Sequence, residues 1–291
     1  MAMNSNAAAQ PAKGSITGRK KTAKVVTYLL LFFLSIVFII PFLWLIGTSI
    51  KSPAEIYQEY TSLFPSKPTL ENYVTAVTKM PFLRYTLNTL VITVLSVIGQ
   101  VTSSSMVAFS IAKIKWKGSR IIFPIIVGTM MIPYQVTMIP IYLIYTKLHL
   151  VGTIVPLVLP TFFGGAYYIF LLRQFFKTIP NSLVESAIID GATPFKVYFR
   201  IILPLCKPAL TSVAIFTFLD AWSDFLGPLL YLTQAEQYTI SLGLQAFMQS
   251  HIVQWGPLMA ASALFTVPII VLFFFAQSYF IEGITVTGIK G

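Results

Sequence analysis

The chain has 291 residues, of which 56% are hydrophobic and only 10% are charged. Soluble domains average about 25% charged residues, so this composition excludes a water-soluble globular protein and indicates a chain that lies largely in lipid. The formal net charge of +11 does not indicate nucleic-acid binding, because beyond the first 24 positions the Lys and Arg residues are scattered between apolar runs.

The N-terminal segment 1–24 is polar, basic and rich in small residues, which is typical of a tail ahead of the first apolar run. The run that follows, 25–47, is longer than a signal-peptide core and lacks a small-x-small cleavage site. We therefore expect a basic cytoplasmic tail followed by an uncleaved first span.

Six apolar segments are each long enough to cross about 30 Å of hydrocarbon at about 1.5 Å per helical residue. They lie at 25–47, 87–109, 121–142, 153–175, 210–232 and 258–280. The sequence thus predicts an all-α, polytopic membrane protein with about six spans in the domain 25–280, followed by a short cytoplasmic tail, 281–291.

The basic residues predict the orientation of these spans. If alternate connections lie in the cytoplasm, that side holds 15 of the 20 Lys and Arg residues. The positive-inside rule then places both termini in the cytoplasm. On this topology Cys206 lies near the inner end of the fifth span, within reach of a thiol reagent added from the cytoplasmic side.

Three of the spans contain helix breakers. The breakers are Pro124, Gly128 and Pro133 in the third span, Pro156, Pro160, Gly164 and Gly165 in the fourth, and Pro268 in the sixth. Broken helices are tolerated where neighbouring helices or a wet cavity satisfy the freed backbone groups. The second span carries a continuous polar stripe, which favours helix packing over pore lining; its members are Thr89, Thr93, Ser96, Gln100 and Ser103.

The connection 177–207 between the fourth and fifth spans is patterned as two short helices. Ser182 and Glu185 have the spacing of a capping box, and Gly191 stands where a helix ends in a left-handed residue. Thr193 is placed to cap a second helix, which Pro204 is expected to close.

Side chains on the first of these two helices suggest a surface for contacts. Leu183, Val184, Ala187 and Ile188 form an apolar face. The carboxylate of Asp190 in the last turn opposes the helix dipole by about 0.3–1 kcal/mol. It therefore needs a partner, either Arg200 or a basic group on another protein.

The fifth span carries two carboxylates, Asp220 and Asp224, four residues apart and thus on one helical face with Thr217 and Gly227. A charge near the membrane midplane costs about 2.5 kcal/mol or more on insertion scales. We therefore expect this stripe to face a translocation path or a protein interface, never lipid. Trp222 falls on another face and is expected to be an outer packing or interface aromatic.

No catalytic or metal-binding pattern accompanies these carboxylates in the sequence. The two histidines, His149 and His251, are isolated, and the single cysteine excludes an internal disulfide. Gly283 and Gly288 have the spacing of a phosphate-binding loop, but the residue that follows is Ile289 and not lysine. We expect no cofactor in this chain.

The connection 177–207 resembles the EAA loop of ABC importer permeases. The resemblance rests on Glu185-Ser186-Ala187, on Asp190-Gly191-Ala192, and on Ile201, Leu203 and Pro204 downstream. The family usually has Ala at the position of Ser186. The resemblance extends over nearly all of the chain after Val25 and narrows to the second, six-span permease of maltose-type carbohydrate importers. Three further stretches carry it, Asn88-Thr89-Leu90, Trp222 to Leu229 and Trp255 to Ser262.

This resemblance implies the type I importer permease fold in a bacterial cytoplasmic membrane. It implies a second homologous permease, two cytoplasmic subunits that bind ATP and Mg, an external sugar-binding protein, and a sugar as the transported substrate. It further implies coupling to the ATPase for Glu185, Ser186, Ala187, Asp190, Gly191 and Ala192, and contact with the binding protein for Gln249, Ser250 and His251. Apart from the resemblance, polar side chains within the spans are our candidates for lining the translocation path; they are Thr217, Asp220, Asp224, Asn88 and Gln100.

Two other classes of membrane protein remain as alternatives at this stage. An ion-coupled carrier needs no ATPase and leaves the patterned loop 177–207 unexplained. A multi-spanning membrane enzyme could use Asp220 and Asp224 as an acid and base pair, but it lacks clustered His, Lys or metal ligands to accompany them.

Overall fold

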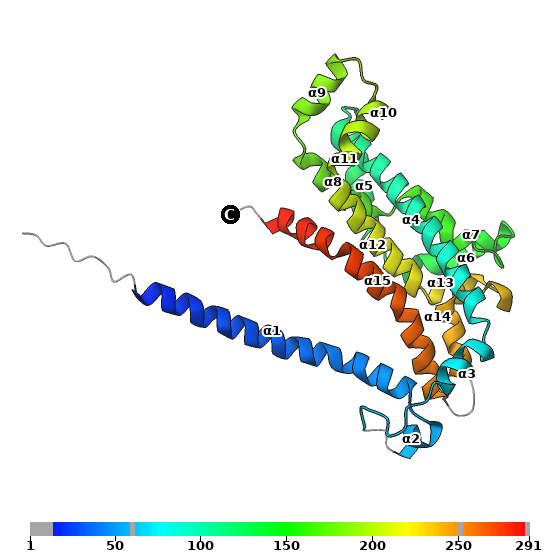
Figure 1. Cartoon of the computed structure of the whole chain (residues 1–291). Helices are drawn as coiled ribbons and strands as arrows, with labels where there is room; N and C mark the ends of the chain where they lie inside the picture. The colour runs from blue at the N-terminus through cyan, green and yellow to red at the C-terminus, as the bar shows by residue number, and fades with distance from the viewer. Residues whose placement is uncertain (1–13, 59–61, 249–252, 289–291) are drawn as a thin grey trace, which may run out of the picture.

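The computed structural model describes residues 14–58, 62–248 and 253–288, and within these ranges every regular element is helical. Among the described residues, four helices are long and apolar enough to cross a membrane, and the number rises to six if each of two strongly bent helix pairs is one span. The helices form an elongated bundle with α9 (Asn181–Ile189) at one end and α2 (Pro53–Gln58) and α3 (Glu71–Lys79) at the other (Figure 1). The all-α membrane fold predicted from the sequence is confirmed.

Helix α1 (Gly14–Ser49) is longer than the predicted span 25–47 and diverges from the bundle, meeting it only near Ser49 (Figure 1). Its apolar side chains are exposed along the whole span, with none of the most hydrophobic stretch buried against the rest of the chain. A helix that is apolar on every side is stable only in hydrocarbon or against another apolar surface. This helix therefore depends on surroundings outside the chain.

The segment after α1 is fixed by a small polar network. The Asn72 side chain donates from Nδ2 to the carbonyls of Ser49 and Lys51, at 3.0 and 2.7 Å. Glu55 accepts hydrogen bonds from the backbone N–H and the hydroxyl of Ser66, at 2.6 and 2.9 Å. These contacts satisfy polar groups that are buried where α1 meets the bundle.

Helix α4 (Phe82–Lys113) runs through the centre and packs against α8 (Ala166–Thr178) and α12 (Lys207–Ser223). Four of the five members of its polar stripe are buried within the subunit, since Thr89, Thr93, Ser96 and Gln100 are all at most 5% exposed. This burial supports the packing role predicted for the stripe, because small polar side chains let neighbouring helices approach closely.

The third predicted span, 121–142, is not a straight helix. Helices α5 (Ser119–Thr129) and α6 (Tyr134–Lys147) meet at an angle of 100°. The ring of Pro133 would collide with the carbonyl of Thr129 four residues earlier if the helix continued. Helix α5 accordingly ends at Thr129.

The fourth span consists of α7 (Val155–Val158), a 3₁₀ turn at Leu159–Phe163, and α8. Gly164 separates the last two with a φ of +82°, a conformation that residues with a side chain rarely adopt. The Pro and Gly residues predicted to break the fourth span thus lie where its helix is interrupted.

The fifth span follows a helical segment made of α10 (Pro194–Val197), a π-helical turn at Tyr198–Ile202, and α11 (Leu203–Leu205). This segment meets α12 at an angle of 81° around Cys206. The sulfur of Cys206 is fully buried, so the expected access for a thiol reagent is wrong. The residue packs in an apolar core shared by α4, α8 and α12.

The chain then continues as α13 (Leu226–Tyr231), a 3₁₀ turn at Ala235–Gln237, α14 (Ile240–Gly243), a second 3₁₀ turn at Leu244–Phe247, and α15 (Trp255–Gly288). Trp222 of α12 is 2% exposed, and its ring stacks on Phe218 and Phe265. Its indole N–H donates to the carbonyl of Phe265 at 3.1 Å. The expected outer position of Trp222 is wrong, because this aromatic joins α12 to α15 inside the subunit.

Candidate functional site

Helix α9 begins one residue before Ser182, and the predicted capping box does not form. Pro180 occupies the N-cap position, and no side chain caps the helix. The start of α9 is held from another element, because Lys113 Nζ at the end of α4 donates to the Ile179 carbonyl at 2.6 Å and to Asn181 Oδ1 at 2.9 Å. A long-range contact thus replaces the local cap expected from the sequence.

The C-terminal end of α9 is a Schellman motif. Gly191 has a φ of +78°, as predicted from the sequence. The N–H of Gly191 donates to the Ile188 carbonyl at 3.0 Å, and the N–H of Ala192 donates to the Ala187 carbonyl at 2.9 Å. The left-handed glycine therefore satisfies the last carbonyls of α9 and reverses the chain direction.

The helix that follows is capped as predicted but does not end as predicted. The Thr193 hydroxyl accepts from the Lys196 N–H at 3.4 Å. Pro204 does not close the helix, because the turn before it widens into the π-helical segment Tyr198–Ile202. Arg200, whose carbonyl would otherwise clash with the ring of Pro204, lies within this wider turn.

Helix α9 presents only part of its apolar surface to the bundle. Of the four residues of the predicted apolar face, Val184 is buried and Ala187 packs against the same core, whereas Leu183 and Ile188 are exposed. The side chain of Ile189 is 85% exposed. Apolar side chains concentrated at the end of an element mark a surface that another protein can cover.

The charges of α9 are loosely held. Glu185 Oε1 lies 3.9 Å from Lys115 Nζ, with both side chains largely exposed. Asp190 caps the helix C-terminus, and in the described ranges it forms no salt bridge with Arg200. A carboxylate at the negative end of a helix is unfavourable without a cation nearby. Both carboxylates are thus available to a basic surface outside the chain.

The membrane carboxylate Asp220 has a partner that the sequence did not suggest. The Tyr168 hydroxyl on α8 donates to Asp220 Oδ2 on α12 at 2.7 Å. Thr217, one turn before Asp220, is buried; its hydroxyl lies beside that of Tyr168 but forms no hydrogen bond of normal geometry. Asp220 itself is exposed on the surface of this subunit.

Asp224 does not share a helical face with Asp220, because α12 ends at Ser223 and Asp224 has extended backbone angles. The ring of Pro228 would clash with the carbonyl of Asp224 if the helix continued. That carbonyl accepts the Ser241 hydroxyl instead, while Asp224 Oδ1 accepts the Gly227 N–H at 3.0 Å. The expected stripe of both carboxylates is wrong, and Asp224 stabilises the start of α13.

The other path candidates use their side chains for contacts within the subunit. Asn88 Nδ2 donates to the carbonyls of Glu236 and Tyr238, at 2.9 and 3.1 Å. Gln100 is 5% exposed and donates to the Ser104 hydroxyl. These contacts favour a packing role. The candidates for contact with a binding protein, Gln249, Ser250 and His251, lie outside the described residues.

The family was identified by comparison with known proteins. The family model described as "Binding-protein-dependent transport system inner membrane component" matches residues 100–286. The chain belongs to this family of membrane permeases. Permeases of this kind are inner-membrane components that work with separate ATP-hydrolysing subunits and a substrate-binding protein, and are not themselves enzymes.

Individual relatives cover nearly all of the permease. It is 32% identical over 94% of its length to the arabinooligosaccharides transport system permease protein AraQ of Halalkalibacterium halodurans, all of which is covered. It is 34% identical over 89% of its length to the diacetylchitobiose uptake system permease protein DasC of Streptomyces coelicolor, covering 94% of that protein.

A solved structure shares the fold of the permease. The match is to a chain of a bacterial ABC transporter involved in the import of the acidic polysaccharide alginate. The TM-score is 0.80 at 22% sequence identity, over 93% of the permease and 100% of that chain. The expected importer-permease fold is therefore confirmed.

Two residues of the site were missed from the sequence, Tyr168 and Lys113. Tyr168 follows the helix break at Gly164, and an aromatic hydroxyl at the start of a spanning helix was its only local signal. Lys113 is the last residue of α4 and its contacts join elements more than 60 positions apart. No described group of His, Cys, Asp and Glu side chains could hold a metal ion.

Proposed function

We propose that this permease is one of two membrane subunits of an ATP-driven sugar importer that works by alternating access. The sugar class is supported by the relatives, several of which are named for transport of oligosaccharides. We propose further that the substrate is an oligosaccharide and that the partner is a second permease of the same family.

The observation that carries the mechanism is the surface of α9. The helix stands at one end of the bundle (Figure 1), and Lys113 fixes its start. Ile188, Ile189 and Asp190 at its C-terminal end are exposed. In our proposal Glu185, Ser186, Ala187, Asp190, Gly191 and Ala192 form the surface that docks on the ATP-binding subunit. Closure of the ATPase then biases the membrane helices toward the outward-facing state.

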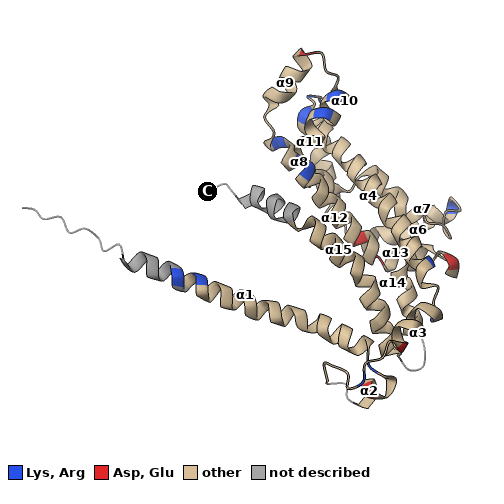
Figure 2. Cartoon of the chain, viewed as in Figure 1, with Lys and Arg blue, Asp and Glu red and all other residues tan. Residues whose placement is uncertain are grey.

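The orientation follows from charge. Most of the Lys and Arg residues of the described chain gather at the α9 end and at the start of α1 (Figure 2). The positive-inside rule supports a cytoplasmic position for that end and for both termini. We propose that the opposite end receives the binding protein, with Gln249, Ser250 and His251 among the contacts.

We propose that the exposed Asp220 and its partner Tyr168 face the path or the seam between the permeases. Because a carboxylate exposed to acyl chains is strongly disfavoured, Asp220 needs water or a protein partner. The exposed apolar surface of α1 must also be buried, and in this proposal the second permease and lipid bury it.

The proposal is tested with the complex reconstituted in proteoliposomes together with its ATPases and binding protein. We expect oligosaccharide uptake that requires both ATP and the binding protein. Uptake driven by an ion gradient in the absence of ATP would contradict the proposal and favour the carrier alternative. A panel of sugars in the same assay, read out as stimulated ATP hydrolysis, identifies the substrate.

A further inference from the structure

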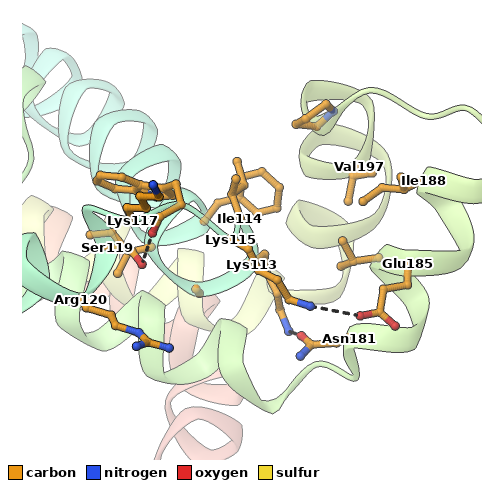
Figure 3. A pocket seen from close by; sticks show the side chains of 16 residues that line it. Lys113, Ile114, Lys115, Lys117, Ser119, Arg120, Asn181, Glu185, Ile188 and Val197 are labelled. Atoms are coloured by element: carbon orange, nitrogen blue, oxygen red, sulfur yellow. Dashed lines mark hydrogen bonds and ion pairs between the residues drawn. The ribbon is translucent and has the colours of Figure 1, made fainter.

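A cavity of about 820 Å³ lies between the end of α4 and the base of α9. Lys117, Ser119 and Arg120 line one side, and Asn181, Glu185 and Ile188 line the other (Figure 3). The cavity therefore separates the connection 114–118 from the helix that we propose as the coupling surface.

The charge in this cavity is unbalanced. Its lining includes four cations against a single carboxylate, Glu185; the cations are Lys113, Lys115, Lys117 and Arg120. Lys113 is occupied by the Ile179 carbonyl and Asn181. Within the described part of the chain, Lys115 is held only by the long 3.9 Å contact with Glu185. The cavity thus offers several basic groups to an anion.

The rest of the lining is apolar. Phe109, Val184 and Val197 are buried side chains that form part of the wall. Trp116 is fixed in the connection, since its indole N–H donates to the Ser110 carbonyl at 3.2 Å. Its ring lies so close to Gly118 that a Cβ there would stand 2.0 Å away. Basic groups beside an apolar wall suit a ligand that is itself amphipathic.

The length of α4 supports a position of the cavity at the membrane surface. Helix α4 has 32 residues and ends at Lys113. At about 1.5 Å per residue it is roughly 48 Å long, which exceeds the roughly 30 Å of hydrocarbon and reaches the headgroup region. Trp116 next to this end is of the residue type that concentrates at membrane interfaces.

We propose that this cavity binds the phosphate headgroup of an anionic phospholipid from the cytoplasmic leaflet. Lys115, Lys117 and Arg120 contact the phosphate, and the apolar wall receives the glycerol and the upper part of an acyl chain. Basic pockets at the cytoplasmic ends of spanning helices bind anionic headgroups in this way. The proposal rests on the orientation given under the proposed function.

The bound headgroup also bears on coupling. A phosphate at Lys115 competes with Glu185 for the same ammonium group, because the existing contact is long and exposed. Binding of the lipid therefore releases the Glu185 carboxylate toward the ATPase. We expect anionic lipid to increase the ATP hydrolysis that substrate and binding protein stimulate.

The test uses the intact complex in nanodiscs of phosphatidylcholine with or without phosphatidylglycerol. Bound phosphatidylglycerol is measured by native mass spectrometry, and stimulated ATP hydrolysis is measured on the same samples. The variant is Lys115→Gln/Lys117→Gln/Arg120→Gln. Its matched control, Lys67→Gln/Arg84→Gln/Lys147→Gln, removes three exposed cations elsewhere.

We expect the parent and the control to retain a phosphatidylglycerol that the cavity variant loses. We also expect phosphatidylglycerol to stimulate ATP hydrolysis of the parent and the control but not of the cavity variant. Equal retention in all three proteins would overturn the proposal. Stimulation of the phosphatidylcholine sample by inorganic phosphate would assign the cavity to a soluble anion instead. Loss of the ATPase subunits from the cavity variant in both lipids would make the cavity a protein interface and overturn the proposal as well.

These outcomes are distinguishable from failure of the proposed function. Lipid retention is measured without any sugar. A complex that transports no sugar but loses its phosphatidylglycerol in the cavity variant would leave this inference intact and contradict only the sugar assignment.

Discussion

Tyr168 and Asp220 lie 52 positions apart in the sequence and meet through a hydrogen bond of 2.7 Å that joins α8 to α12. The bond is charge-assisted when Asp220 is ionised, and bonds of this kind contribute about 1.5–3 kcal/mol. It orients a carboxylate that is exposed at the surface of the subunit. Four variants separate the role of the Tyr168–Asp220 pair from that of the neighbouring Asp224.

Asp220→Asn keeps the shape of the side chain and removes its charge. If Asp220 faces the path, we expect the Michaelis constant or the maximal rate of sugar uptake to change by about tenfold, with normal yield of the complex. Tyr168→Phe should have a smaller effect of the same kind, and the double variant should be less than additive because the two side chains contact each other. Poor assembly of Asp220→Asn with normal uptake per complex would assign the pair to the permease seam.

Asp224→Ala provides the contrast. Its carboxylate accepts the Gly227 N–H at the start of α13, and loss of such a cap costs about 1 kcal/mol. We expect a lower melting temperature of the complex and an unchanged Michaelis constant. A changed Michaelis constant with an unchanged melting temperature would instead indicate that Asp224 lines the translocation path.

Gly191 has a φ of +78° and open space where a Cβ would stand. The cost of a side chain is therefore backbone strain alone, about 1–2 kcal/mol. Gly191→Ala and Gly191→Leu should reduce stimulated ATP hydrolysis to a similar extent, while Gly191→Asn, which tolerates this conformation, should retain most of it. A much larger loss for Leu than for Ala would indicate a contact with the ATPase at this position.

Glu55 supplies a pH-dependent element at the opposite end of the bundle. The Ser66 backbone N–H, with help from the Ser66 hydroxyl and the charge of Lys51, holds the pKa of Glu55 below its ordinary value against the opposing effect of burial. A lowered pKa means that the carboxylate stabilises the fold above the ordinary carboxyl pKa, near 4.3, and that this contribution is lost as the pH falls through the folded-state value.

We therefore expect Glu55→Gln to lower the melting temperature at neutral pH, and the gap to the parent to close below about pH 4. Glu71→Gln, at an exposed position in the same outer segment, is the control. If the difference in melting temperature between Glu55→Gln and the parent stayed constant down to acid pH, the substitution would act through packing and not through a charge-dependent contact.

The buried position of Cys206 changes how the topology is tested. We expect the thiol to resist maleimides from either side of the membrane until the protein is unfolded. In a Cys206→Ala background, Ile189→Cys places a thiol at a highly exposed site on α9. An impermeant maleimide should label it in inverted vesicles stripped of the ATPase that we propose to dock there; labelling in right-side-out vesicles would reverse the proposed orientation.

The sequence predicts the features of this permease that depend on a few neighbouring residues. Gly191 and the cap at Thr193 follow from local backbone chemistry, and apolar runs mark the spans because the hydrocarbon requires them. The break after Ser223 was missed although Pro228 signals it, since the clash is with a carbonyl four residues earlier. The partner of Asp220 could not be predicted, because contacts between distant helices depend on packing.

The contacts of Lys113 and Asn88 make α4 a strut between the two ends of the bundle. Lys113 donates hydrogen bonds to Ile179 and Asn181 at the start of α9. Asn88, 25 positions earlier on the same helix, donates to the carbonyls of Glu236 and Tyr238. At about 1.5 Å per residue, Asn88 and Lys113 are roughly 37 Å apart on one continuous helix. A displacement of α9 that moves α4 along its axis must therefore also displace the segment 236–238. This route between the two ends of the bundle does not include the fifth span.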